Sequence, residues 1–148
     1  MRTAEAVAPS LGVALVATNV RNADEIDRAL TTIANESETG LIVLPHPITI
    51  ANRAAIHALT ARYRMPAIHP YRYFATDGGL ISYGPDQIDQ WRGAAAYIDR
   101  ILRGAEKPAN LPVQAPTKYE LVINVKTAMA LGLNISTTLL ARATEVIE

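Results

Sequence analysis

Short apolar runs alternate with amphipathic helical patterns along most of this chain, and this alternation limits the fold more than any other feature. Residues 13–17 and 41–44 are apolar with little internal alternation, which is typical of strands covered on both faces. The first run is followed by Ile26, Leu30 and Ile33 at helical spacing. Strands that alternate with helices form a mostly parallel sheet. We therefore predict an α/β fold, a three-layer sandwich whose mostly parallel sheet has about five strands.

The remaining elements follow from the same two periodicities and from the residues that end helices. In chain order we predict a helix over 22–35, a second helix around 55–63, strands at 66–68 and 80–83, a long helix over 85–103, a strand at 119–124, a short helix over 127–131 and a final helix over 136–146. Residues 105–118 contain three prolines, so we expect an extended connector there and a candidate internal boundary.

The stretch from His69 to Asp86 gathers much of the aromatic content and the only Gly-Gly pair. It reads as a strand, a polar aromatic loop and a second strand. The aromatic side chains of this loop either pack beneath it or form a recognition surface. Arg72, between Tyr71 and Tyr73, could clamp a carboxylate while the rings stack on the ligand, or could be a solvated surface arginine.

Composition narrows the classes of function. A chain of 148 residues fits one domain, and its 14 basic and 14 acidic residues balance, so we expect no nucleic-acid footprint. The absence of cysteine excludes disulfides and thiolate chemistry. No apolar run reaches the ~20 residues of a membrane span, and the first ten residues lack the pattern of a secretory signal. Residues 3–11 read as the last turns of a helix, which suggests that a segment precedes them.

The polar residues do not assemble a familiar catalytic or cofactor motif. His46 and His69 both stand at strand ends but lack the partner spacing of a metal site, and His57 lies within a helical pattern as a structural or solvent-facing residue. The glycines fit neither a dinucleotide-binding fingerprint nor a phosphate-binding loop, and Ser82 lacks the frame of a nucleophile elbow. We therefore expect no metal, no cofactor and no catalytic set.

Several blocks of sequence, taken in order, resemble one known family. They are 40–45, 65–68, 78–86, 94–104, 111–124 and 131–133. Together they are similar to the carboxyl-terminal half of an ABC transporter substrate-binding protein, in the group whose better-known members bind tryptophan or tyrosine. The resemblance implies one flavodoxin-like lobe of a type I periplasmic binding protein, with residues 1–148 forming that lobe and 105–118 as a candidate crossover linker.

The resemblance also implies a function and a set of site residues. Such proteins close two lobes on a small ligand and dock on a membrane permease, as carriers rather than enzymes. Carried over by position, the cleft face comprises His46, Pro47, Tyr71, Arg72, Tyr73 and Tyr83. His46 departs from the acidic residue often found there, which leaves open what holds the polar end of the ligand. The ligand class implied is a small organic molecule such as an aromatic amino acid or an aromatic carboxylate.

Two other readings stay open at this stage. One is a homo-oligomeric α/β binding module without a transport role, in which a second copy covers the surface left by the first lobe. The other is a flavodoxin-like enzyme, which is less favoured because no nucleophile or cofactor loop is found. The family is periplasmic, whereas this chain, expressed as given without a signal peptide, is expected in the cytoplasm.

Overall fold

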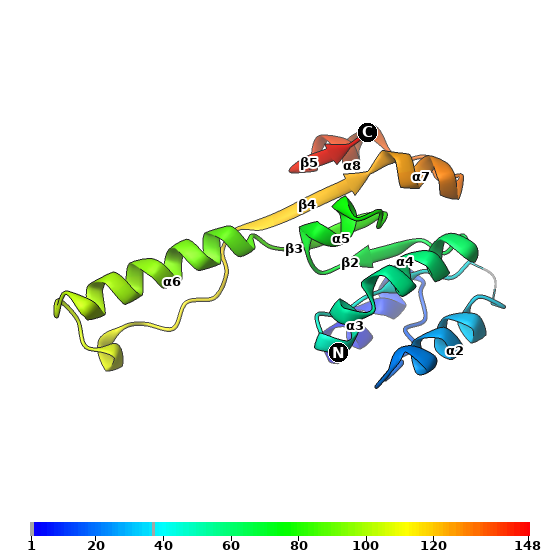
Figure 1. The fold of residues 1–148 in the computed structure, drawn as a ribbon. Helices are drawn as coiled ribbons and strands as arrows, with labels where there is room; N and C mark the ends of the chain where they lie inside the picture. The colour runs from blue at the N-terminus through cyan, green and yellow to red at the C-terminus, as the bar shows by residue number, and fades with distance from the viewer. Residues whose placement is uncertain (1, 37) are drawn as a thin grey trace.

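The computed structural model describes residues 2–36 and 38–148 (Figure 1). In chain order the elements are α1 (Arg2–Val7), η1 (Ala8–Leu11), α2 (Ala23–Ile33), β1 (Leu41–Ile42), α3 (Pro47–Ala51), α4 (Arg53–Arg62), β2 (Ala67–His69), α5 (Arg72–Thr76), β3 (Ile81–Pro85), α6 (Gln87–Leu102), η2 (Pro108–Asn110), β4 (Tyr119–Asn124), α7 (Val125–Leu131), α8 (Thr137–Ala141) and β5 (Glu145–Ile147). Among these residues no helix is both long enough and apolar enough to cross a bilayer.

One five-stranded sheet organises the molecule. Its strands lie in the order β1-β2-β3-β4-β5, and β1, β2 and β3 run parallel. β4 is antiparallel to β3, and β5 is parallel to β4. The longest ladder joins β3 to β4, from Ile81 opposite Ile123 to Pro85 opposite Tyr119. The predicted α/β class and the mostly parallel sheet of about five strands are therefore confirmed.

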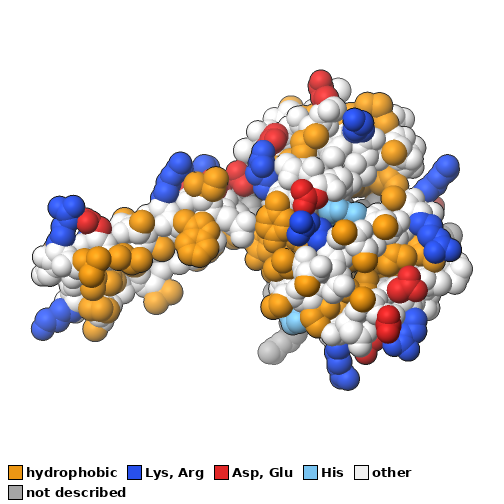
Figure 2. All heavy atoms as spheres, viewed as in Figure 1, with side chains coloured by type: hydrophobic (Ala, Val, Ile, Leu, Met, Phe, Trp, Pro, Cys, Tyr) orange, Lys and Arg blue, Asp and Glu red, His pale blue; other side chains and the backbone are white. Residues whose placement is uncertain are grey.

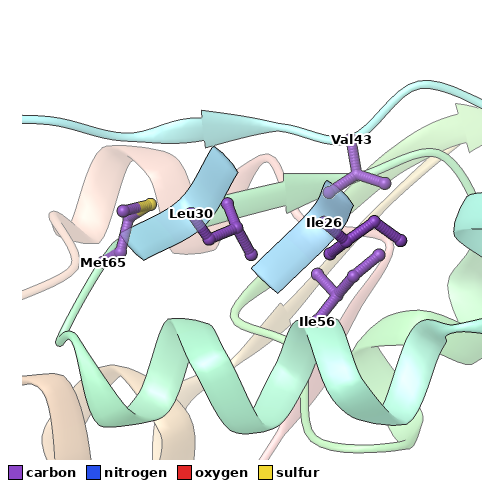
Figure 3. Packing of buried hydrophobic residues seen from close by; sticks show 5 residues of the cluster. All are labelled: Ile26, Leu30, Val43, Ile56 and Met65. Carbon is purple, nitrogen blue, oxygen red and sulfur yellow. The ribbon is translucent and has the colours of Figure 1, made fainter. Parts of the chain in front are cut away.

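The largest apolar cluster joins α2 and α4 to the end of β1. Its buried members are Ile26, Leu30, Val43, Ile56 and Met65 (Figure 3). Asn22 caps α2 by accepting a hydrogen bond from the Glu25 backbone N–H at 2.9 Å, as the Asn22/Glu25 spacing predicted. The cap fixes where α2 begins, and the stripe at Ile26 and Leu30 then faces the cluster.

A second set of contacts holds α5 against β3 and β4. Phe74 and Ala75 of α5 are completely buried. The Asn124 side chain, at the end of β4, donates to the Ala75 carbonyl at 3.1 Å and caps α7 by accepting from the Thr127 N–H. The Thr127 hydroxyl in turn donates to the Gly78 carbonyl at 3.0 Å. These bonds fix the short helix that follows β2 relative to the centre of the sheet.

An arm, residues 87–118, extends away from this body and returns to it through β4 (Figure 1). α6 begins at Asp86, which caps the helix and accepts a 2.6 Å hydrogen bond from the Lys118 ammonium. The returning connector is held to α6 by the Tyr97 hydroxyl, which donates to the Pro112 carbonyl at 2.8 Å. Apolar side chains gather along the arm in the space-filling view (Figure 2). The exposed ones are Ile88, Trp91, Ile98, Leu102 and Val113.

Three sequence-based expectations about elements were wrong. Residues 13–17 belong to no strand, because no neighbouring strand pairs with them. The aromatic loop at 69–74 contains helix α5, which the buried Phe74 anchors. The final helix stops at Ala141. Glu145–Ile147 form β5 instead, because they pair with the free edge of β4. This pairing begins with the 2.7 Å bond from the Thr144 N–H to the Leu121 carbonyl.

Candidate functional site

The predicted site residues follow strands that end at one edge of the sheet. His46 and Pro47 come after β1 and Tyr71 to Tyr73 come after β2, whereas Tyr83 is the middle residue of β3. Because β1, β2 and β3 are parallel, their carboxyl ends meet at the same edge, which is where ligands of such sheets bind. β4 runs the other way and β5 is parallel to it, so Glu145 enters the sheet at this edge as well.

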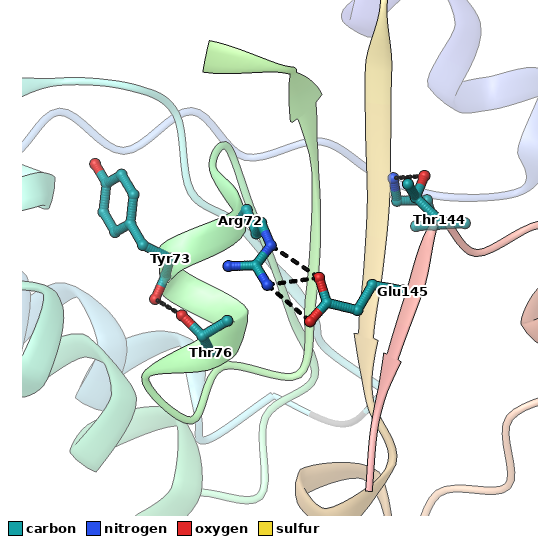
Figure 4. Close-up of polar contacts among 6 residues, drawn as sticks. Arg72, Tyr73, Thr76, Thr144 and Glu145 are labelled. Atoms are coloured by element: carbon teal, nitrogen blue, oxygen red, sulfur yellow. Dashed lines mark hydrogen bonds and ion pairs between the residues drawn. The ribbon is translucent and has the colours of Figure 1, made fainter. Parts of the chain in front are cut away.

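Arg72 is held by Glu145 in a bidentate ion pair (Figure 4). Its Nε and Nη2 atoms each donate to a different carboxylate oxygen at 2.8 Å. The two side chains keep 48% and 36% of their surface exposed, so a molecule arriving from solvent can reach both. From the sequence, the Arg72 guanidinium was expected to have no charged partner within the chain, but it is paired with Glu145. A ligand carboxylate would therefore have to share Arg72 with Glu145.

The aromatic rings beside Arg72 are stacked and differ in how exposed they are. The rings of Tyr71 and Tyr73 lie 5.5 Å apart, and Tyr73 stacks on Phe74 at 5.0 Å. The Arg53 guanidinium lies over the Tyr73 ring at 5.3 Å, and burial raises the pKa of the Tyr73 hydroxyl. Tyr71 and Tyr73 remain partly exposed while Phe74 is fully buried. The inner ring therefore packs beneath the segment, as one reading expected, and the two outer rings stay accessible in part.

Behind the stack lies a pair of histidines, of which His69 is buried and His57 is partly buried. His69, which is 1% exposed, stacks on Phe74 at 5.1 Å, and its ring lies edge-on to His57 at 5.0 Å. Neither ring nitrogen of His69 has a hydrogen-bond partner among the described residues, and the same holds for the hydroxyl of Ser82, its neighbour in register on β3. Burial, with a smaller effect from His57, lowers the pKa of His69 to about 4. His69 is thus neutral and internal near pH 7.

His46 and Pro47 form the start of a short helix. The His46 Nδ1 atom accepts from the Ile48 N–H at 3.3 Å, and the Thr49 hydroxyl accepts from the His46 N–H at 3.2 Å. Pro47 occupies the first helical position, where a missing N–H costs nothing. Both residues are exposed. Among the described residues no hydrogen bond or ring contact joins His46 to Tyr71, Arg72 or Tyr73.

Tyr83 lines a separate groove at the base of the arm. Its ring stacks on Tyr119 at 5.7 Å, and the groove has a volume of about 400 Å³. Leu121, Leu139, Arg142 and Thr144 complete the lining. The structure therefore places the six predicted residues in three groups: His46 with Pro47, Tyr71 to Tyr73 with Glu145, and Tyr83 with Tyr119.

The chain path at this edge depends on one glycine. A Cβ atom added to Gly84 would lie 1.8 Å from the carbonyl oxygen of Pro70, so no other residue fits without moving the backbone. The contact presses the end of β3 against the turn after β2. It therefore fixes the base of the arm relative to Tyr71 and Arg72.

Three side chains in these groups were missed from the sequence. Glu145 was expected within a helix, and its partner Arg72 is 73 positions away, so no local pattern joins them. Tyr119 was recognised only as the start of a strand, and Arg142 carried no motif. The one available signal was the aromatic side chain of Tyr119. Tyr83 pairs with Leu121, and Tyr119 lies two positions from Leu121, so the two rings are diagonal neighbours across the strands.

The whole chain matches a known protein family. A family model described as "ABC transporter substrate binding protein" matches residues 1–147. The chain belongs to this family. No curated protein matches it.

Solved structures agree with this membership. A conserved domain protein from Vibrio cholerae superposes with a TM-score of 0.84 at 24% identity, over 98% of this chain and 48% of that one. The ABC domain in complex with L-Trp from Streptococcus pneumonia superposes with a TM-score of 0.86 at 25% identity, over 99% of this chain and 49% of that one. A ligand-free, open substrate-binding protein with adhesive properties from Clostridium difficile gives 0.68 at 14% identity, over 99% and 48%. This substrate-binding-family chain spans about half the length of these structures.

Proposed function

We propose that this chain is the second lobe of the solute receptor of an ABC transporter, and that its ligand is an aromatic amino acid. The observation that carries the proposal is the exposed Arg72–Glu145 pair beside the stacked Tyr71 and Tyr73 rings. The relative from Streptococcus pneumonia, at 25% identity, was solved with L-Trp, which supports the same ligand class. The lobe would supply one wall of the site and the rest of the receptor the other.

The ion pair favours a zwitterion over a simple carboxylate. A carboxylate that takes hydrogen bonds from Arg72 comes close to Glu145, which has the same charge. A zwitterion also brings an ammonium group, which Glu145 can accept in place of Arg72. Exposed ion pairs are worth only about 0–1 kcal/mol, so dividing this one between the two ends of a ligand costs little. The rings of Tyr71 and Tyr73 would then face the aromatic body of the ligand.

The proposed role of this chain is to bind a ligand for transport, with no catalytic step. The two histidines near the edge are committed elsewhere, since His46 caps α3 and His69 is buried with a lowered pKa. The partners proposed are the ligand and an ABC permease, and the place of action is the periplasmic side of the membrane. The arm, which includes connector 105–118, would cross to the first lobe. The apolar side chains of the arm, such as Trp91, would be covered there.

Calorimetric or NMR titration of the chain with three matched compounds tests the ligand class. L-tryptophan has both charges, indole-3-propionate lacks the ammonium group and tryptamine lacks the carboxylate. We expect L-tryptophan to bind most tightly, by about 5- to 30-fold, since each charge-assisted bond contributes about 1–2 kcal/mol. Arg72→Ala should weaken L-tryptophan and indole-3-propionate, and Glu145→Gln should weaken L-tryptophan and tryptamine.

The control variant is Arg100→Ala, which breaks a comparable exposed ion pair with Glu106 on the arm and should change no affinity. Equal affinities for L-tryptophan and indole-3-propionate would show that the zwitterion is not recognised. An Arg72→Ala chain that binds L-tryptophan as well as the unaltered chain would remove this edge from the site.

A further inference from the structure

Four aromatic rings form one ladder that runs from the core to the surface at the edge that carries Arg72. His69 stacks on Phe74 at 5.1 Å, with 17° between the ring planes. Phe74 stacks in turn on Tyr73 at 5.0 Å and 27°, and Tyr73 stacks on Tyr71 at 5.5 Å and 22°. The two inner rings are buried and the two outer rings are partly exposed. A ligand ring that stacks on this ladder therefore meets its outer end.

Helix α4 supports the ladder with two side chains one turn apart, which lie on the same face of the helix. The ring of His57 lies edge-on to Phe74, with 5.9 Å between the centroids. Arg53, the first residue of α4, places its guanidinium over the Tyr73 ring at 5.3 Å and over the Phe74 ring at 5.8 Å. Its Nε atom also lies 2.7 Å from Oδ2 of Asp77, the residue that ends α5. Arg53 thus contacts α5 both at a ring face and at the end of the helix.

The Tyr73 ring depends on this contact more than the inner rings do. α5 has only five residues, and a helix that short has little stability of its own, so tertiary contacts must hold its side chains. Phe74 is held by complete burial. Tyr73 is only partly buried, and a ring at the surface keeps its rotamer freedom unless a neighbour fixes it. A planar guanidinium that stacks on the ring, and is itself fixed by a carboxylate, can do this.

We propose that Arg53 is a positioning residue of the binding site: paired with Asp77, it holds the Tyr73 ring in the ladder and so fixes the aromatic face presented to a ligand. The identity of the ligand is taken from the proposed function, on which this inference rests. The side chains that take the charged groups of the ligand are different ones, Arg72 and Glu145. The loss of Arg53 should therefore have the same effect on every ligand that carries the same ring, whatever its charges.

Titration of Arg53→Ala with the three matched indole compounds tests this signature. L-tryptophan, indole-3-propionate and tryptamine should each lose about 2- to 10-fold in affinity, the size of one aromatic contact, and the three losses should be equal. Arg62→Ala is the matched control, because Arg62 lies over the Tyr63 ring at 5.4 Å on the same helix, and it should change none of the three affinities. A loss confined to the two compounds with a carboxylate would show that Arg53 binds the ligand directly, which overturns the positioning role.

The partner carboxylate gives a second check. Asp77→Asn keeps the size of the side chain and removes its charge, so Arg53 is no longer fixed and the affinity for L-tryptophan should again fall. In the double variant, Arg53→Ala with Asp77→Asn, the loss should not exceed the larger of the two single losses, because both act through one ring. Single losses that multiply in the double variant would contradict the paired action.

Ring signals of the ligand-free chain separate positioning from damage to the fold. Phe74 is the only phenylalanine, and the Tyr73 signals are assigned by their absence in Tyr73→Phe. In NMR spectra, Arg53→Ala should move the Tyr73 ring toward the shifts and couplings of a freely rotating side chain and leave the buried Phe74 ring unchanged. Movement of both rings would mean that α5 as a whole has come loose, and movement of neither would mean that Arg53 does not hold Tyr73. Both results overturn the inference.

Failure of the proposed function looks different from failure of this inference. If the unaltered chain binds none of the three compounds, that function is wrong, while the ring signals still decide whether Arg53 positions Tyr73. If the compounds bind and Arg53→Ala leaves all three affinities unchanged, the function stands and the positioning role is wrong.

Discussion

At the scale of single residues, the edge of the sheet depends on side chains whose partners are far away in sequence. Arg72 and Tyr71 were identified as candidates from the aromatic stretch alone, and the structure places them at the sheet edge. Glu145 could not be identified, because the ion pair exists only once β5 has joined β4. The two following predictions concern Gly84 and His69, which lie behind this edge and help to position it.

Replacement of Gly84 should destabilise the chain. Gly84→Ala places a methyl group 1.8 Å from the Pro70 carbonyl oxygen, so the backbone must shift, and overpacking of this kind costs about 1–3 kcal/mol. Gly93→Ala is the matched control, because its methyl group meets open space within α6 and helical alanine is favoured by up to about 1 kcal/mol. Urea unfolding should show opposite signs for the two variants. Equal effects would mean that the close approach at Gly84 does not exist.

The buried His69 should make stability depend on pH. Its pKa is about 4 in the folded chain against 6.5 when unfolded, so the unfolded chain binds more protons between these values. The free energy of unfolding should therefore fall as pH falls from about 6.5 to about 4, by about 3 kcal/mol. His57, whose pKa burial also lowers, adds to the same trend.

Urea unfolding at several pH values checks this. In His69→Gln the slope between pH 6.5 and 4 should be reduced, whatever the absolute stability of the variant. A His69→Gln chain with the full slope would show that the loss arises from other groups.

At the scale of elements, the sequence predicted what depends on local pattern and missed what depends on pairing. The cap at Asn22, the long helix ending near Gly104 and the strand at 119–124 were found, because periodicity and end signals lie within each element. The strand at 13–17 and the final helix over 136–146 were wrong. Each of these segments forms a strand only where an adjacent strand pairs with it. Residues 13–17 lack such a neighbour, whereas residues 145–147 pair with β4.

The arm makes a prediction at this scale. Trp91 is the only tryptophan of the chain and is 72% exposed on α6, so its fluorescence reports on the arm alone. Emission of the isolated chain should resemble that of tryptophan in water and be readily quenched by acrylamide. Addition of the first lobe should move the emission to shorter wavelengths, because the stripe of Ile88, Trp91 and Ile98 becomes covered.

Dilution separates this from self-association. If Trp91 is shielded at high concentration and exposed on dilution, a second copy covers the arm and the homo-oligomeric alternative holds. An emission that stays water-like after the first lobe is added would contradict the proposed crossover.

At the scale of the whole molecule, the chain is a family member that exposes several apolar or unpaired surfaces. The apolar arm, the unpaired backbone at residues 13–20 and β1, and the open edge at Arg72 and Tyr71 are distinct parts of its surface. The ladder between β3 and β4 and the anchored α5 hold the edge that carries Arg72 in place. The central claim is that this edge is half of a binding site.

The most direct test is to map where L-tryptophan binds by following the backbone amide signals of the chain during an NMR titration. The account predicts saturable shifts at residues 71–73 and at Glu145, with smaller ones at His46 and Tyr83, and none along the arm or residues 13–20. Shifts confined to the groove between Tyr119 and Arg142, or spread along the exposed apolar side chains of the arm, would contradict it.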